Sequence, residues 1–452
     1  MSCYYKPRIS PTMRHGPAGA GVEGSVALLA LGYGAAMAQT NWAGNYTYRA
    51  RAIHAPSTLE QLQELINALP RVRVLGSRHS FTDIADSDEL VTLERMAREV
   101  VVDRDALKVS LSGAVRYGEL VQELSRERLA LANLASLPHI AVAGAVSTAT
   151  HGSGDHNGNL ATAVAGLEIV ASDGNVLNMT RRDSDFEGAV VGLGAVGAVV
   201  RITLDLEPAY QVRQQVFEGL RWEQLFEHFD LIASSGYSVS MFTRWGETID
   251  QVWIKSRITE KSEKPADEFF GAAAATKQMH PIVGLDSINC TPQLGEPGPW
   301  SERLPHFRMG FTPSSGAEIQ SEYIVPRSHA VSAIGAVLQI GLTIRPLIQV
   351  SEIRTIAADT LWMSPQYGQD TVALHFTWKP EPERVNRLLI ELERALAPFE
   401  PRPHWGKVFL ADAKTIGPMY ERLGDFANLL DRLDPRGAFR NEWLESRVLG
   451  TS

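Results

Sequence analysis

The chain has 452 residues, of which 44% are hydrophobic and 21% are charged, and its formal net charge at pH 7 is -9. This length predicts two or three globular domains with substantial cores. The acidic balance, without any cluster of Lys and Arg, argues against a surface that binds nucleic acid. Cys3 and Cys290 are the only cysteines, which excludes a disulfide framework and a cysteine-built metal site. We expect no metal.

The first 38 residues differ from the rest of the chain. Basic residues precede a short apolar run at 26–38 that ends in Ala-Met-Ala, as in a secretory signal. Glu23 and the glycines inside the run are atypical of such a signal, so we favour an extension upstream of a true start at Met37. Export is the alternative to the expected cytoplasmic location. The run is too short to span a bilayer, and no membrane partner is expected.

The first part of the chain after this segment alternates short strands with helices. A helix with a capping box from Ser57 to Glu60 is predicted over 57–66. The alternation at 71–75 predicts a half-buried strand, which runs into a turn at 76–81. Further elements are predicted as strands at 90–93, 100–102 and 107–111 and a helix at 117–124. This irregular order predicts a mixed α+β domain rather than a regular βαβ series.

Two glycine-containing segments follow. Residues 137–158 are rich in small residues, which let a backbone approach a ligand, and their hydroxyl and N–H groups suit a phosphate. A tight loop between strands is the alternative. A hairpin turn is predicted at Gly174. Residues 192–197 match the dinucleotide fingerprint G-x-G-x-x-G, but a β-branched strand follows where the fingerprint needs a helix. NAD is therefore disfavoured, and a loop leading into a strand is predicted.

From about residue 211 the predicted strands and helices become longer. The irregular stretch at 262–316, rich in Pro and Gly, indicates a functional loop or a lid. Amphipathic helices are predicted at 383–397 and 418–430. We find no internal repeat.

Polar residues are spaced two apart in two predicted strands of this region. Glu352 and Arg354 point to the same face of one strand, as do His375 and Thr377 of another, with Phe376 turned away. Such a lining can bind several hydroxyl groups, because an unpaired buried hydroxyl is costly. An exposed ion pair and half-buried sheet residues are the alternatives.

Four segments together resemble the vanillyl-alcohol-oxidase-type flavoproteins and, within them, the alditol oxidases. They are 72–81 (VRVLGSRHSF), 135–154 (ASLPHIAVAGAVSTATHGSG), 352–359 (EIRTIAAD) and 402–409 (RPHWGKVF). The resemblance runs from about Thr40 to the C-terminus. It implies a two-domain FAD-linked oxidase of the α+β class. We expect an FAD-binding domain of the PCMH type at 39–210, an inserted mixed-sheet substrate domain at 211–415, and a segment at 416–452 that returns to the first domain.

The resemblance implies that the cofactor is FAD, bonded covalently to His79. The positions that match cofactor-contacting residues are Val74, Leu75, Gly76, Ser77, Arg78, His79, Ser80, Ser136, Val142, Gly144, Thr148, Ala149, Thr150, His151, Val199 and His404. Arg78 stands where the motif has glycine. At a positive φ it would cost about 1 kcal/mol or more, or it could donate to the pyrophosphate. Ala141 replaces a frequent serine, which removes a hydroxyl contact.

The same match supports assigning roles in the chemistry. Arg354 and Lys407 are assigned to stabilise the reacting oxygen, and His375 to accept a proton or to orient a neighbour. The residues predicted to hold the substrate are Ser136, Glu352, Arg354 and Thr377. The implied reaction oxidises the primary C1 hydroxyl of an alditol, such as xylitol or sorbitol, to the aldose and reduces O2 to H2O2. We expect a monomer whose partners are a small polyol and O2.

Other functions are weighed against this one. An aldonolactone oxidase of the gulonolactone or arabinonolactone type shares the histidine motif, although the segments 311–316 and 352–359 favour alditols. A dehydrogenase that uses another electron acceptor stays open, because the sequence does not reveal access for oxygen. A non-catalytic flavin- or carbohydrate-binding protein is disfavoured, because the polar residues that the chemistry needs are all present.

Overall fold

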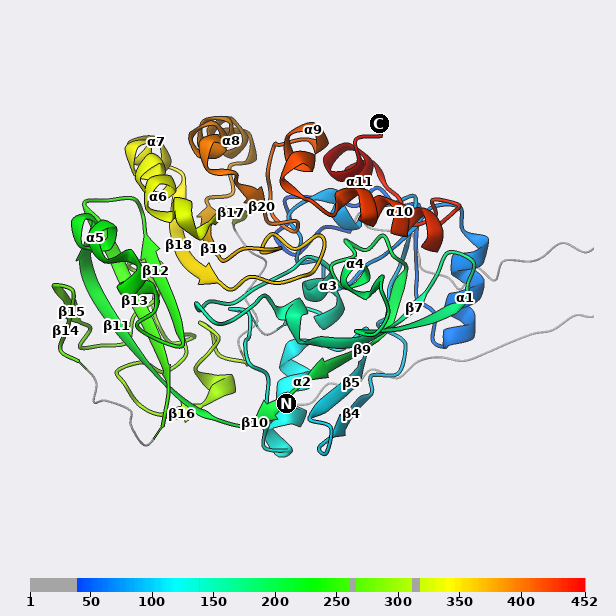
Figure 1. Ribbon diagram of the computed structural model, residues 1–452, viewed down its shortest axis with the longest axis horizontal. Helices are drawn as coiled ribbons and strands as arrows, with labels where there is room; N and C mark the ends of the chain where they lie inside the picture. The colour runs from blue at the N-terminus through cyan, green and yellow to red at the C-terminus, as the bar shows by residue number, and fades with distance from the viewer. Residues whose placement is uncertain (1–38, 138, 260–265, 311–317, 452) are drawn as a thin grey trace, which may run out of the picture. The chain divides into compact units, whose positions relative to one another are not determined.

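The computed structural model describes residues 39–137, 139–259, 266–310 and 318–451. The expected extension at 1–38 and the alditol-favouring segment at 311–316 lie outside these residues. Within the described ranges, no helix is long and apolar enough to cross a membrane. Figure 1 shows the arrangement of the elements, with the labels used below.

The first small sheet is parallel, in the order β1-β3-β2, and consists of Ala52–His54, Glu89–Val91 and Val72–Val74. Helix α1, Leu59–Ala68, buries Leu62 and Ile66 against it. The predicted capping box is wrong by one residue, because the Thr58 side chain accepts the hydrogen bond from the Gln61 backbone N–H. The amide and hydroxyl of Ser57 instead bind the Gln61 side chain.

A five-stranded antiparallel sheet follows, in the order β4-β5-β9-β7-β8. Its strands are Val100–Asp103, Lys108–Ser112, Ala198–Asp205, Val164–Val170 and Val176–Thr180. Helices α2 (Tyr117–Arg126), α3 (Val142–Ser147) and α4 (Phe186–Val190) belong to the same part of the chain, in which β6 (Leu129–Ala130) pairs with β10 (Glu207–Pro208). The prediction at 192–197 is confirmed, since this loop leads directly into β9. The hairpin at Gly174 is also confirmed.

The largest sheet has ten strands, with the path β14-β15-β11-β13-β12-β18-β19-β17-β20 and β16 paired to β11. Along this path the strands are Glu268–Phe269, Ala272–Ala274, Gln211–Arg221, Thr248–Arg257, Ser238–Thr243, Ile348–Ile356, Thr371–Trp378, Ile319–Pro326 and Arg402–Pro403, with β16 at Gly298–Pro299. Its pairs are antiparallel. Three of these short strands lie in the stretch predicted to be an irregular loop.

Helices lie along one face of this sheet (Figure 1). They are α5 (Trp222–Ala233), α6 (Ala330–Gln339), α7 (Gly341–Ile344) and α8 (Pro382–Leu396). Helix α6 contacts β17, β19 and α8, and the apolar side chains Leu374, Phe376 and Trp378 of β19 are buried in the core. Since apolar residues alternate with polar ones along β19, its polar side chains point to the opposite face, away from the helices.

The C-terminal segment contains the helices α9 (Ala413–Ile416), α10 (Leu423–Leu433) and α11 (Glu442–Leu444). Helix α10 contacts α4, and α11 contacts the 3-10 turn at 83–85. The predicted helix at 418–430 begins later, because 417–419 forms a 3-10 turn around Pro418. The residue boundaries of the two domains stay a prediction.

Candidate active site

One cavity of about 570 Å³ brings the predicted site residues together. Of the residues expected to contact the cofactor, all line this cavity except Val142 and Ala149, whose side chains are buried in the core instead. The residues expected to act on the substrate also line it, namely Ser136, Glu352, Arg354, His375, Thr377 and Lys407. Segments that are far apart in the sequence therefore share one site.

The loop after β2 forms one wall of this cavity. Arg78 has φ 61, so the position does use the left-handed conformation that favours glycine. Its side chain is exposed and donates to the Gln39 side-chain oxygen at 3.4 Å. The Ser77 hydroxyl accepts from the Ala141 backbone N–H at 3.0 Å, which ties the loop to the start of α3. Ala141 takes part in this contact through its backbone, so the missing serine hydroxyl does not affect it.

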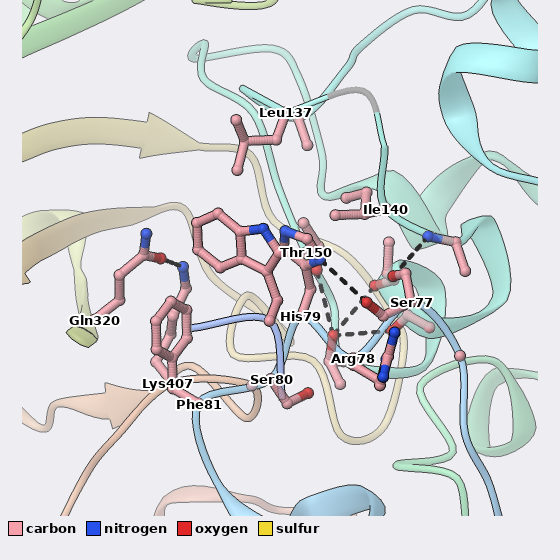
Figure 2. A pocket seen from close by; sticks show the side chains of 18 of the residues that line it. Ser77, Arg78, His79, Ser80, Phe81, Leu137, Ile140, Thr150, Gln320 and Lys407 are labelled. Atoms are coloured by element: carbon pink, nitrogen blue, oxygen red, sulfur yellow. Dashed lines mark hydrogen bonds between the residues drawn. The ribbon is translucent and has the colours of Figure 1, made fainter. Parts of the chain in front are cut away.

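His79 lies in the centre of this part of the cavity, between Lys407 and Gln320 on one side and Ser77 and Arg78 on the other (Figure 2). Its ring stacks on Trp42 with centroids 4.7 Å apart, and its Nε2 lies 2.7 Å from Nε2 of His139. Burial, with a smaller effect of His139, lowers the pKa of His79 to about 3. The imidazole is therefore neutral at pH 7 and keeps a lone pair. The sequence patterns did not single out Trp42 or His139.

Small residues leave room for a cofactor beside this loop. Gly76 and Gly144 both line the cavity. A Cβ built at Gly144 would meet no atom within 4 Å, and one at Gly76 would meet only the Ala141 Cβ at 3.7 Å. Nδ1 of His139 is buried without a hydrogen-bond partner among the described residues, which is costly unless a ligand pairs with it. The open cradle and the unpaired donor or acceptor fit a large polar cofactor such as FAD.

The opposite wall is a face of the large sheet. The register places Glu322 of β17, His375 of β19 and Glu352 of β18 side by side across three strands. Gln320 is paired with Thr377 in the same way. Phe376 faces the other side, where it stacks on Trp378 with ring centroids 5.1 Å apart. The predicted orientation of both polar pairs is therefore confirmed.

Glu322 is the centre of a buried cluster of charged and polar side chains. Its carboxylate accepts from Arg354 Nη2 at 2.7 Å and lies 3.3 Å from His151 Nε2 and 3.4 Å from His375 Nδ1. Burial opposes its charge, yet His151, Arg354 and His375 hold the pKa of Glu322 well below its usual value. Sequence reasoning missed Glu322, although the alternation of Gln320 and Glu322 along a strand was a usable signal.

Three side chains of the same cluster are close enough to bind one metal ion, but the carboxylate among them already has a cation as its partner. One ligand atom each of His151, Glu322 and His404 lies within 4.8 Å of the others. The guanidinium of Arg354 already donates to the Glu322 carboxylate. Although burial opposes the charge on Arg354, Glu352 and Glu322 raise its pKa. A fixed cation therefore neutralises the carboxylate, and we interpret the group as an ion-pair cluster.

Lys407 connects the two walls. It follows β20 in the segment 404–407, and the Gly406 carbonyl accepts from the Phe81 backbone N–H at 2.8 Å. The Lys407 ammonium donates to the Gln320 side-chain oxygen and lies 5.3 Å from the centroid of the Phe81 ring (Figure 2). Burial lowers the pKa of Lys407, with Glu322 opposing this effect. The structure thus places an ammonium group in reach of both the His79 loop and the polar sheet.

Comparison with known proteins shows the family to which the chain belongs. The chain is 47% identical to an alditol oxidase from Streptomyces sp. over 418 residues, which cover 91% of this chain and 99% of that protein. The chain belongs to the alditol oxidase family of flavoproteins. An L-gulono-1,4-lactone dehydrogenase from Mycobacterium tuberculosis is 28% identical over 91% of this chain and 99% of its own length.

Two family models match different parts of this alditol oxidase family member, and each part contributes one wall of the cavity. An FAD binding domain matches residues 50–180, which include the His79 loop, and D-arabinono-1,4-lactone oxidase matches residues 317–447, which include β17, β18, β19 and Lys407. The fold resembles a cholesterol oxidase from B. sterolicum, with a TM-score of 0.71, 14% identity, and coverage of 90% of this chain and 96% of that one. The chain is thus an FAD-dependent oxidoreductase with a two-domain oxidase fold.

Proposed function

We propose that this protein oxidises the primary C1 hydroxyl of an alditol such as xylitol or sorbitol to the aldose, and that O2 is reduced to H2O2. The observation that carries the proposal is the row of buried polar side chains on β17, β18 and β19, which faces the same cavity as the His79 loop. A polyol needs several such partners, because each hydroxyl left unpaired in a buried site is costly.

Arg354 and Lys407 are proposed to stabilise the substrate oxygen at the reacting carbon. Bound FAD would accept the hydride from that carbon, so negative charge develops on the oxygen as its proton leaves. Preorganised cations aimed at such charge are among the largest contributions to catalysis. Glu322 fixes the Arg354 guanidinium at 2.7 Å, and Gln320 holds the Lys407 ammonium. Both cations are therefore oriented before the substrate binds.

His375 is proposed to take the hydroxyl proton. Its Nε2 lies 3.1 Å from the Thr377 hydroxyl and its Nδ1 lies 3.4 Å from Glu322. Burial lowers the pKa of His375, with Glu322 opposing the shift, so the ring is neutral at pH 7 and can accept a proton. The Glu322 carboxylate then stabilises the imidazolium that forms.

The remaining hydroxyls are proposed to bind Glu352, Thr377 and Ser136. Burial opposes the charge on Glu352, but Arg354 and His306 lower its pKa, so it is an acceptor at neutral pH. Thr377 is buried on the same face of the sheet, and Ser136 lines the cavity from the opposite wall. The polyol chain would then bind between the two walls, with hydrogen bonds to both.

Covalent attachment of FAD at His79 is proposed from the state of its imidazole. The ring is neutral and stacked on Trp42, and it lines the cavity that has room for the cofactor, so one ring nitrogen carries a lone pair that can form the bond. Acid precipitation of purified protein should leave yellow flavin in the pellet, and His79→Ala should release it to the supernatant. Flavin in the supernatant of the unaltered protein contradicts the covalent bond.

The reaction itself is tested with the flavin spectrum. Xylitol added without oxygen should bleach the flavin, and admitted air should restore the colour and release one equivalent of peroxide. L-Gulono-1,4-lactone serves as the comparison, because the match to a D-arabinono-1,4-lactone oxidase model and the similarity to an L-gulono-1,4-lactone dehydrogenase make a lactone the second candidate substrate. Bleaching by the lactone but not by xylitol or sorbitol would overturn the proposal in favour of a lactone oxidase.

A further inference from the structure

Lys255 is a wholly buried lysine that the proposed chemistry does not use. It lies on β13, opposite Ser238 of β12, and its side chain is 1% exposed. Its ammonium donates to the Leu304 carbonyl and to His306 Nδ1, the latter at 3.0 Å. No salt bridge joins Lys255 to a carboxylate within the described parts of the chain. A buried ammonium without a carboxylate at contact distance is costly, which calls for a reason beyond packing.

His306 connects Lys255 to Glu352 of the proposed substrate site. Its Nε2 lies 2.8 Å from Oε1 of Glu352, and both residues are buried and line the cavity. An ionised carboxylate has acceptors and no donor, so the proton of a neutral His306 must be on Nε2, and Nδ1 must accept from the Lys255 side chain. His306 therefore donates to Glu352. The rings of Phe242 and Trp253 stand edge-on to the imidazole, with centroids 5.3 Å and 5.5 Å away, and hold its plane.

The second oxygen of Glu352 has a different partner. Oε2 lies 3.5 Å from Arg354 Nε, while Oε1 takes the His306 hydrogen bond. The carboxylate is thus held from two sides in one orientation. Burial lowers the pKa of His306 to about 4, with Lys255 acting in the same direction, so the imidazole is neutral and leaves the negative charge of Glu352 in place.

We propose that Lys255 and His306 form a positioning relay that keeps Glu352 ionised and oriented as the acceptor for polyol hydroxyls away from the reacting carbon. This inference rests on the proposed function and adds two specificity-determining residues to it. The relay runs from β13 through the segment before 310 to Glu352 of β18, and no hydrogen bond joins Lys255 or His306 to His375 or Lys407 within the described residues. It should affect the binding of the polyol chain more than the hydride transfer.

The first test is Lys255→Met, which keeps the apolar stem and removes the ammonium. We expect KM for xylitol to rise about tenfold, because the hydrogen bond from His306 to the charged Glu352 is weakened. We expect kcat to change less than about twofold, because this hydrogen bond lies outside the reacting centre. Ser238→Ala is the matched control, because Ser238 is the buried cross-strand neighbour of Lys255 outside the relay. Its KM should stay within about twofold of the unaltered protein. An unchanged KM in Lys255→Met overturns the relay.

The second test uses His306. His306→Ala should raise KM about tenfold, while His306→Gln, whose amide can still donate to Glu352, should recover most of this loss. Lys255→Met added to His306→Ala should cause no further increase, because both changes act through one hydrogen bond. Independent effects that multiply in the double variant contradict the proposal, as does a His306→Gln variant that is no better than His306→Ala.

A spectroscopic test does not depend on activity. In 15N-histidine spectra of the unaltered holoprotein, the His306 signal, assigned by its loss in His306→Gln, should show the tautomer with the proton on Nε2. A proton on Nδ1 overturns the relay directly, even if Lys255→Met does not fold. Failure of the proposed function looks different, since the unaltered protein would then show no flavin bleaching with any polyol.

Discussion

The two walls of the cavity differ in the kinds of groups that line them. The His79 loop and the segments at 135–137 and 139–151 shape their wall with backbone, small side chains and stacked rings, and Arg78 adopts a left-handed conformation there. The wall formed by β17, β18 and β19 instead consists of buried charges that neutralise one another around Glu322. The first wall accommodates a large group by leaving space, and the second selects a small one by fixing donors and acceptors.

This difference predicts that the two walls respond differently to substitution. Changes in the loop wall should alter cofactor retention through geometry, with small effects on stability. Changes in the sheet wall should alter stability and turnover together, because removing one charge leaves its partners buried and unpaired. The predictions below test this contrast, beginning with the largest effect.

Glu322→Ala should be the most damaging substitution in the sheet wall. It leaves Arg354 without its closest carboxylate and His151 and His375 without theirs, so the free energy of unfolding should fall by about 3–5 kcal/mol. Chemical denaturation followed by tryptophan fluorescence measures this. Asp230→Ala is the control, since Asp230 pairs with Arg327 at 2.8 Å but its side chain is 80% exposed, and it should cost less than about 1 kcal/mol. If both variants lose the same free energy of unfolding, the proposed difference between the two walls is wrong.

Lys407→Met should separate chemistry from stability. The variant keeps the buried stem and removes the ammonium, so kcat on xylitol should fall about 10²–10³-fold, as for loss of one charge-stabilising donor. The flavin spectrum and the denaturation midpoint should stay unchanged. Lys379→Met is the control, because Lys379 binds the Pro346 carbonyl on the surface. A normal kcat in Lys407→Met would remove Lys407 from the chemistry.

The buried lysine of the relay predicts a pH-dependent stability. Burial lowers the pKa of Lys255 to about 7, whereas the unfolded chain keeps this proton to about pH 10. Between these values the unfolded state binds more protons, so stability rises with pH, by at most about 1.4 kcal/mol per pH unit.

Lys255→Met lacks this contribution. Denaturation at pH 7 and pH 9 should therefore show the unaltered protein gaining stability relative to the variant as pH rises. Other titrating groups cancel in this difference. A difference that stays constant between the two pH values would mean that Lys255 titrates normally in the folded protein.

The smallest effect is expected in the loop wall. Arg78→Gly removes the strain of a left-handed arginine but adds freedom to the unfolded chain, so the free energy of unfolding should change by less than about 1 kcal/mol. Arg128→Gly is the control, because exposed Arg128 has φ 54 outside the cavity. A lower ratio of covalently bound flavin to protein after acid precipitation in Arg78→Gly but not in Arg128→Gly would show that the Arg78 side chain helps to place the cofactor for attachment. Equal ratios in the two variants leave only the backbone role.

The sequence by itself determined the local features of this protein. Strand alternation predicted that Glu352 and Arg354, and likewise His375 and Thr377, face one side, and the structure confirms this because side-chain direction in a strand has a period of two. Family resemblance located His79 and Lys407, which the structure places in one cavity. The β-branched strand after residue 197 disfavoured a dinucleotide fingerprint, because the fingerprint needs a helix at that position.

Only the tertiary structure decided which distant residues meet. Glu322 joins the site because β17 lies beside β19 in the sheet, and His306 joins it from an irregular segment whose position no periodicity predicts. Trp42 and His139 reach His79 through loop packing. Such partners depend on strand order and on the paths of loops, which are set by burial across the whole chain rather than by neighbouring residues.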